Sequence, residues 1–198
     1  MAITNYGELK TAIAAWQNKT SLTSYLADFV TLAEAKFNRR LRVNEMETVL
    51  AETAIASDVV ARPAGMVAIK SIWSTGDDQR TLEPKTLEFI VRRPSLAARP
   101  QFYAWSGSNL QFYPSSGSVA AIYYTKVPAL SDGSPTNWLL SASPDLYLYA
   151  GIEQAAIYLK DEAAEKKYAG LANGLIEELN SRDVANQISG GPLVARAR

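Results

Sequence analysis

Cysteine and histidine are both absent from the 198 residues of this chain. Their absence excludes disulfides, zinc sites built on Cys or His, Cys–His and Ser–His–Asp catalysis, and a histidine pH switch. The catalytic groups that remain are carboxylates, lysine, tyrosine and serine. We therefore expect a protein that is not an enzyme and that carries no metal or other cofactor.

The formal net charge of the chain at pH 7 is zero, because 20 basic residues balance 20 acidic ones. This balance does not suggest a chain that coats nucleic acid. Long apolar runs are also lacking, since no stretch approaches the ~18 residues needed to cross a bilayer. The opening MAITNYGELK has no basic segment followed by an apolar core. We expect no signal peptide, no membrane contact and a cytoplasmic start.

Helical periodicity marks the beginning of the chain. Asn5 can cap a helix whose third residue is Glu8, which is the capping-box spacing. Apolar residues then recur every three to four positions on one face of this helix, ending with Trp16. A longer amphipathic helix is predicted from about Leu22 to Val43. The chain therefore opens with a predicted helical hairpin.

A second helical region is predicted near the end of the chain, after a loop at residues 128–143. Ser143 is a favoured N-cap and Pro144 a favoured first helical residue, and the helix that follows is apolar nearly all round. Asp161 begins a last helix. The helices at the two ends can pack together as a bundle.

The middle of the chain is rich in Val, Ile, Thr and aromatic residues that alternate along candidate strands, which indicates core and intersubunit packing. Gly76-Asp77-Asp78 is interpreted as a turn between strands and not as a metal site. We predict about five strands and a short helix at 86–92. The predicted fold class is α+β, with terminal helices forming a helical bundle and a small, mostly antiparallel β-sheet or sandwich inserted in the middle. The predicted parts are 1–44, 45–128, 129–184 and an extended tail at 185–198.

Three strings of residues carry a resemblance to a known family. They are ITNYGELKTAIAAW, SYLADFVTLAEAKFNRRLRVNEMET and YYTKVPALSDGSPTNWLLSASPDLYLYAGIEQAAIYLKD. They resemble the adaptor or head-completion proteins of short-tailed bacteriophages, the group of tail tubular protein A-like gatekeepers. The resemblance covers residues 3–48 and 123–161, and the β-rich middle matches only in pattern.

The resemblance implies a virion structural protein at the head-to-tail junction, put together in the host cytoplasm. It implies an adaptor ring, usually a dodecamer of twelve copies, that links the portal to the tail and extends the DNA channel. The implied partners are further copies of the chain, the portal protein, and a tail nozzle or tail tube protein. Genomic DNA would pass through the channel without sequence-specific binding.

Two other functions stay open from the residues alone. A carboxylate-based cell-wall hydrolase would need a pair such as Glu83 and Glu88 in a cleft, with one pKa raised. A DNA-binding module also stays open. Arg92, Arg93 and Arg99 form a basic patch that is either a phosphate contact or the ordinary charge of a surface loop. The zero net charge and the missing histidine count against both.

Candidate partner contacts fall first on the second helix. Arg39, Arg40 and Arg42 are predicted either to lie on a solvated helix face or to contact an adjacent subunit, DNA or acidic portal residues.

Aromatic residues near the second helical region add three more candidates. Trp138 lies just before the buried helix, and Tyr147 and Tyr149 point to different faces of it, so that one face is available to a neighbour.

The tail contains the last candidates. Leu193 and Val194 form an apolar pair, and Arg196 and Arg198 follow it. The segment has too little apolar surface to fold alone, and it is either disordered or ordered by a partner. The resemblance favours docking into the portal.

Overall fold

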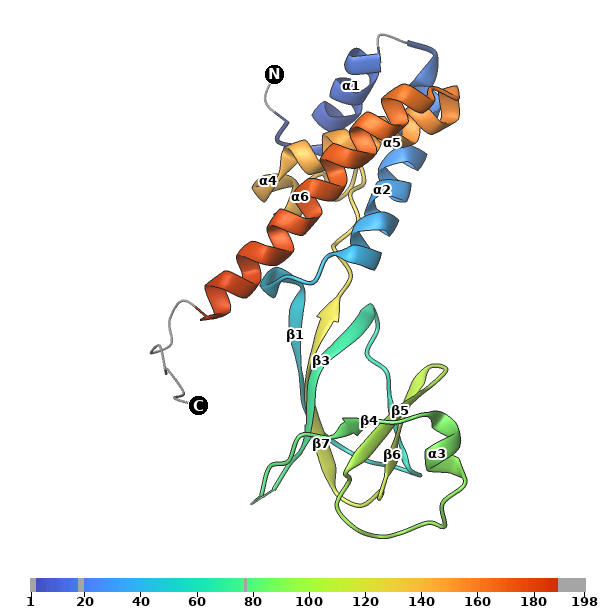
Figure 1. The fold of residues 1–198 in the computed structure, drawn as a ribbon, viewed down its shortest axis with the longest axis vertical. Helices are drawn as coiled ribbons and strands as arrows, with labels where there is room; N and C mark the ends of the chain where they lie inside the picture. The colour runs from blue at the N-terminus through green and yellow to red at the C-terminus, as the bar shows by residue number, and fades with distance from the viewer. Residues whose placement is uncertain (1–2, 18–19, 77, 189–198) are drawn as a thin grey trace, which may run out of the picture. The chain divides into compact units, whose positions relative to one another are not determined.

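The computed structural model describes residues 3–17, 20–76 and 78–188 (Figure 1). The chain divides into two compact units, a helical unit of residues 1–45 and 127–198 and a β-rich unit of residues 46–126. The fold class is α+β, with helices at both ends of the chain and small, mainly antiparallel sheets between them. This confirms the predicted fold class.

Helix α1 spans Tyr6–Gln17 and begins as the sequence predicts. The Asn5 side chain accepts a hydrogen bond of 2.9 Å from the Glu8 backbone N–H. The Glu8 carboxylate reaches back and accepts 2.7 Å from the backbone N–H of Thr4, one residue before the cap. Two backbone N–H groups at the helix start are thereby satisfied, which is the stabilising feature of a capping box.

The long helix expected from Leu22 to Val43 is shorter, and this corrects the prediction. A 3-10 helix, η1, spans Thr20–Tyr25, and α2 spans Leu26–Arg40. Leu41 is already extended, with φ −77° and ψ 139°. Leu41 and Val43 are both buried in this extended segment, so tertiary packing overrides their helical pattern.

Between the β-rich unit and residue 188 the chain forms three helices, α4 at Trp138–Ala142, α5 at Pro144–Leu159 and α6 at Glu162–Ile188. Helix α4 corrects the loop predicted at 128–143. Helix α6 also continues through residues 185–188, which were predicted as extended tail. No glycine or proline occurs between Gly174 and Gly190, so no helix-breaking residue ends the helix at residue 184.

Helix α5 is the centre of the helical unit and packs against α1, α2 and α6 (Figure 1). Its burial on several sides agrees with its apolar composition. Gly151 faces α1 so closely that a Cβ added there would collide with the Ile13 side chain. On the side of α2, the rings of Phe37 and Tyr147 meet edge to face with centroids 5.0 Å apart.

The β-rich unit contains two sheets within its described residues, with strand orders β1-β7-β3 and β2-β6-β5-β4. The strands are β1 Glu47–Ala54, β2 Val59–Ala61, β3 Met66–Ser74, β4 Glu83–Pro84, β5 Phe102–Ser106, β6 Asn109–Tyr113 and β7 Ser118–Thr125. All described pairs are antiparallel except β4 with β5. The prediction of about five strands missed β2 and β4, because segments of three and two residues show no alternation.

The core of the β-rich unit lies among residues from both sheets. Its buried members are Val60, Ile72, Leu82, Tyr103, Leu110, Phe112, Val119 and Ala121. The short helix α3, Leu87–Val91, is capped by Thr86, whose hydroxyl accepts 3.3 Å from the Phe89 N–H.

Candidate assembly surfaces

A buried polar network fixes the inner surface of the helical unit. One carboxylate oxygen of Glu34 accepts a hydrogen bond of 2.8 Å from the Leu130 N–H and one of 3.2 Å from the Tyr147 hydroxyl. The Asn137 amide donates 2.7 Å to the same hydroxyl. Burial raises the pKa of the Glu34 carboxyl, and its two hydrogen bonds oppose this shift. The network ties α2 to α5 and to the segment before α4.

The segment of the helical unit that precedes α4 is held by further side-chain bonds. Asn137 also donates 2.6 Å to the Pro128 carbonyl and accepts 2.8 Å from the Leu140 N–H as the N-cap of α4. Asn38 accepts 2.8 Å from the Val127 N–H. Because these bonds satisfy backbone groups that face the interior, the segment can lie against the helices at little cost.

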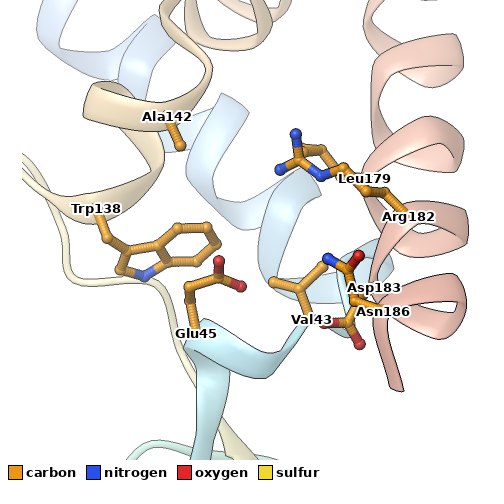
Figure 2. Close-up of a pocket in the computed structure, with 8 residues that line it drawn as sticks. All are labelled: Val43, Glu45, Trp138, Ala142, Leu179, Arg182, Asp183 and Asn186. Atoms are coloured by element: carbon orange, nitrogen blue, oxygen red, sulfur yellow. The ribbon is translucent and has the colours of Figure 1, made fainter. Parts of the chain in front are cut away.

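A small hollow lies among α4, α6 and the segment that follows α2 (Figure 2). Its volume is about 140 Å³, and it is lined by Val43, Glu45, Trp138, Ala142, Leu179, Arg182, Asp183 and Asn186. Figure 2 shows the Trp138 indole beside the Glu45 carboxylate, with Arg182 across the hollow. Pockets for small-molecule ligands usually measure roughly 300–1,000 Å³. The hollow is therefore smaller than a typical cofactor pocket.

Trp138, a predicted contact residue, is thus half-buried at the rim of this hollow. The hollow itself is built by α6. Asp183 on α6 accepts a hydrogen bond of 3.0 Å from the Asn44 N–H and is itself buried. Sequence reasoning missed α6's role, because Leu179 and Asp183 lie about 40 residues beyond Trp138 and no local pattern joins them.

The three arginines predicted as contacts have different environments. Arg40 donates 2.6 Å to Asn173 and lies 3.7 Å from the Glu177 carboxylate. Arg42 donates 3.1 Å to the carbonyl of Asn38. Arg39 is exposed, and within the described part of the chain it has no hydrogen bond or ion pair. Of the three side chains, that of Arg39 is the one left available to a partner.

The two tyrosines of α5 that were predicted as contacts differ in burial. Tyr147 is completely buried, so its side chain serves the core and offers no surface within this subunit. Tyr149 is half-buried, with ring centroids 6.2 Å from Trp16 and 6.1 Å from Tyr168. Trp16 was predicted on one apolar face of α1 with Leu9 and Ile13, but it is 55% exposed while those two are buried. Trp16 and Tyr149 together form an aromatic surface.

The other charged candidates are engaged in local pairs. Arg92 pairs with Glu88 one turn earlier, and Glu83 lies 3.0 Å from Lys85. The Asp78 carboxylate accepts a hydrogen bond of 2.7 Å from Arg80.

Arg93 and Arg99 also have partners within the subunit. Arg93 lies over the Phe89 ring at 4.1 Å, and Arg99 donates a hydrogen bond of 2.6 Å to the Asp78 carbonyl. Arg92, Arg93 and Arg99 are thus exposed but have local partners, and Glu83 and Glu88 are each paired with a basic side chain.

Across residues 3–17, 20–76 and 78–188 there is no group of three or more residues that could hold a metal ion. None of the helices in the same ranges is long and apolar enough to cross a bilayer.

Asp77 and the tail candidates Leu193, Val194, Arg196 and Arg198 lie outside the described residues. Their proposed contacts stay predictions.

The family model of the SU10 adaptor protein matches residues 4–196. The chain belongs to the SU10 adaptor protein family. This is a phage head-tail adaptor family, which confirms the resemblance found in the sequence, and its members are virion components. The match includes the β-rich unit, for which the sequence offered only a pattern. A search of curated proteins found no match to this adaptor.

Proposed function

We propose that this adaptor forms a ring, of twelve copies, that joins the portal protein to the tail and continues the DNA channel. The observation that carries the proposal is the family match over residues 4–196, which covers both units of the subunit. The described residues support a structural role. Each buried polar side-chain atom among them has a hydrogen-bond partner, and the hollow at Trp138 is sized for a side chain.

The proposed mechanism is geometric and adhesive. The network of Glu34, Asn137 and Tyr147 holds the helices of one subunit in a fixed arrangement, so that each copy presents the same surfaces. A closed ring needs two different complementary surfaces on every subunit. DNA passing through such a ring needs no base contacts, which is in keeping with the zero net charge of the chain.

The proposed partners at the two ends of the ring are the portal and a tail nozzle or tail tube protein. On the portal side we place the C-terminal tail. Ordering its backbone costs roughly 1–2 kcal/mol per residue, which two apolar side chains cannot offset alone. Strand or groove docking adds backbone hydrogen bonds, while Leu193 and Val194 act as anchors. Arg196 and Arg198 would pair with acidic portal residues.

The direct test mixes the full-length adaptor with the portal of the same phage and measures mass by light scattering and native mass spectrometry. The expected product is a portal ring carrying one ring of adaptor subunits. Failure of the two proteins to associate at micromolar concentrations would contradict the proposal.

The role of the tail is tested by deleting residues 191–198 from the adaptor. We expect weaker portal binding and a smaller dependence of binding on salt, because two cations are lost. Alanine at both Leu193 and Val194 is the matched variant that keeps the charges. Portal affinity equal to wild type in the folded, truncated protein would remove the tail from the interface.

A further inference from the structure

The outward face of α2 has a regular pattern that the subunit itself does not use. Asp28, Leu32, Ala35 and Arg39 follow one another at spacings of four, three and four residues, which places them on one line along a helix. They lie opposite the buried positions of α2. Asp28 and Arg39 are exposed, Ala35 is partly exposed, and Leu32 is 51% exposed. We call these four residues the α2 stripe.

Helix α6 carries a second line of residues with the same spacing. Lys167, Leu171, Gly174 and Glu178 are all exposed, and Leu171 is 42% exposed. They lie on the side of α6 away from its buried residues Ala172, Ile176 and Leu179. A Cβ added at Gly174 would meet nothing within 4 Å. We call these four residues the α6 stripe.

The two stripes are complementary when the helices are set side by side in the same direction. Asp28 then faces Lys167 and Arg39 faces Glu178, so opposite charges meet at both ends. Between them Leu32 faces Leu171, and Ala35 faces Gly174. The spacing of four, three and four is that of a parallel coiled-coil seam, in which equivalent positions of two helices form layers.

The charges of the stripes are not neutralised inside the subunit. In the described residues, Asp28, Arg39 and Glu178 have no ion pair or hydrogen bond, and Lys167 lies over the ring of Tyr168 at 5.3 Å. By contrast, the neighbouring Arg40 and Glu177 are used within the subunit. Each stripe therefore contains an exposed leucine and charged side chains that form no ion pair within the subunit.

The two stripes cannot meet within one chain. The side of α6 that faces α2 and its extension carries Asn173, Asn180 and Asp183, which bind residues 40, 42 and 44 in that order. This order also shows that α2 and α6 run in the same direction, as Figure 1 shows. The α6 stripe lies on another side of its helix, so the α2 stripe can reach it only from another molecule.

We propose that the α2 stripe of one subunit packs in parallel against the α6 stripe of a second copy, and that this contact closes the adaptor ring. The inference rests on the ring proposed above. Neighbours in a ring are related by rotation about one axis, so helices that share a direction in the subunit can stay nearly parallel across the interface. Gly174 opposite Ala35 lets the backbones approach closely. A glycine inside an exposed helix otherwise costs about 1 kcal/mol relative to alanine.

The absence of cysteine makes a cross-linking test clean. The full-length variant Ala35→Cys/Gly174→Cys, oxidised at a concentration where wild type forms rings, should give a reducible ladder of dimer, trimer and higher species. Each single variant should stay uncross-linked. A ladder missing from the double variant while wild type forms rings would overturn the pairing. A covalent dimer from Gly174→Cys alone would also overturn it, because α6 would then meet α6.

Charge reversal gives an independent test. Arg39→Glu and Glu178→Arg should each raise the concentration needed for ring formation by about tenfold or more, because like charges then face one another. An equimolar mixture of the two single variants should restore assembly, since every interface in an alternating ring pairs opposite charges. The matched control is Lys166→Glu, which changes an exposed charge of α6 outside the stripe.

The possible results distinguish a failure of the proposed ring from a failure of the proposed contact between the stripes. Wild type that forms no ring, with or without portal, would refute the ring and the inference together. Rings that tolerate both single reversals, or single reversals that the mixture does not rescue, would refute the stripe pairing and leave the ring intact.

Discussion

The Asn180 side chain on α6 accepts a hydrogen bond of 2.9 Å from the backbone N–H of Arg42, which lies 138 positions earlier in the chain. The same amide donates 3.1 Å to the carbonyl of Arg40. One side chain therefore satisfies both kinds of backbone group where the chain leaves α2 and becomes extended.

We expect Asn180→Ala to lower the free energy of unfolding by about 1–2 kcal/mol, because two hydrogen bonds of ordinary net strength are lost. Urea denaturation followed by circular dichroism measures the change. Ser181→Ala, at an exposed neighbouring position of the same helix, is the control and should lie within about 0.5 kcal/mol of wild type. Equal stability of the Asn180 and Ser181 variants would show that the amide is dispensable.

The buried carboxyl of Glu34 gives a second prediction. Glu34→Gln keeps an oxygen that can accept from Leu130 and Tyr147 but removes the charge. Because burial disfavours the ionised carboxyl, we expect Glu34→Gln to be at least as stable as wild type at pH 7. Glu34→Ala leaves the two donors without their acceptor and should lose about 1–3 kcal/mol. A Gln variant as unstable as the Ala variant would contradict this account.

The same carboxyl predicts a pH dependence. Its folded-state pKa is raised above the usual 4.5, so folding favours the protonated form. Stability from this group is full below the unfolded pKa and is lost as pH rises through the raised folded pKa. The difference in unfolding free energy between Glu34→Gln and wild type should therefore shrink toward zero near pH 4. A difference that instead grows on acidification would show the opposite shift.

Two glycines of the helical unit should respond to alanine with opposite signs. Gly151→Ala places a methyl group against the Ile13 side chain, which is completely buried and has little space to move into. Overpacking of this kind costs about 1–3 kcal/mol, and we expect it to exceed the ~1 kcal/mol that alanine gains over glycine in a helix. Gly170 on α6 has nothing within 4 Å of an added Cβ, so Gly170→Ala should stabilise the isolated subunit by about 0.5–1 kcal/mol. Adding Ile13→Val should recover part of the Gly151→Ala loss. Thermal unfolding of the three variants at a concentration below assembly measures these effects.

Catalysis is expected to be absent. The chain lacks Cys and His, and Glu83 and Glu88 are each engaged in surface ion pairs. Purified adaptor incubated with peptidoglycan or with DNA should give the same signal as buffer. Turnover that is abolished by Glu83→Gln or Glu88→Gln would refute the structural role as the whole function.

Signals confined to a few neighbouring residues could be interpreted correctly from the sequence. The Asn5–Glu8 cap and the start of α5 at Pro144 formed as predicted, because each depends on hydrogen bonds or dihedral angles within one turn. The short helix predicted at 86–92 is likewise present as α3. The adaptor resemblance was likewise visible in short strings of residues, and the family match confirmed it.

Contacts between distant segments decided the rest. Helix α4 has a local cap, Asn137, which the sequence analysis missed, and the same amide also binds Pro128 and Tyr147. Leu41 and Val43 fit a helical pattern, yet they are buried in an extended segment that α6 holds from more than 130 positions away.

For residues on helix surfaces, the sequence determines the spacing along the helix, and tertiary packing determines which of them are exposed. The equal spacing of Asp28 to Arg39 and of Lys167 to Glu178 is present in the sequence. Periodicity alone, however, assigns Tyr147 and Tyr149 to two faces without saying which one is buried. That choice depends on which helices cover α5, and α5 acquires its neighbours only when α1, α2 and α6 pack around it. Helical phase is a local property of the backbone, whereas exposure is set by whatever packs against it.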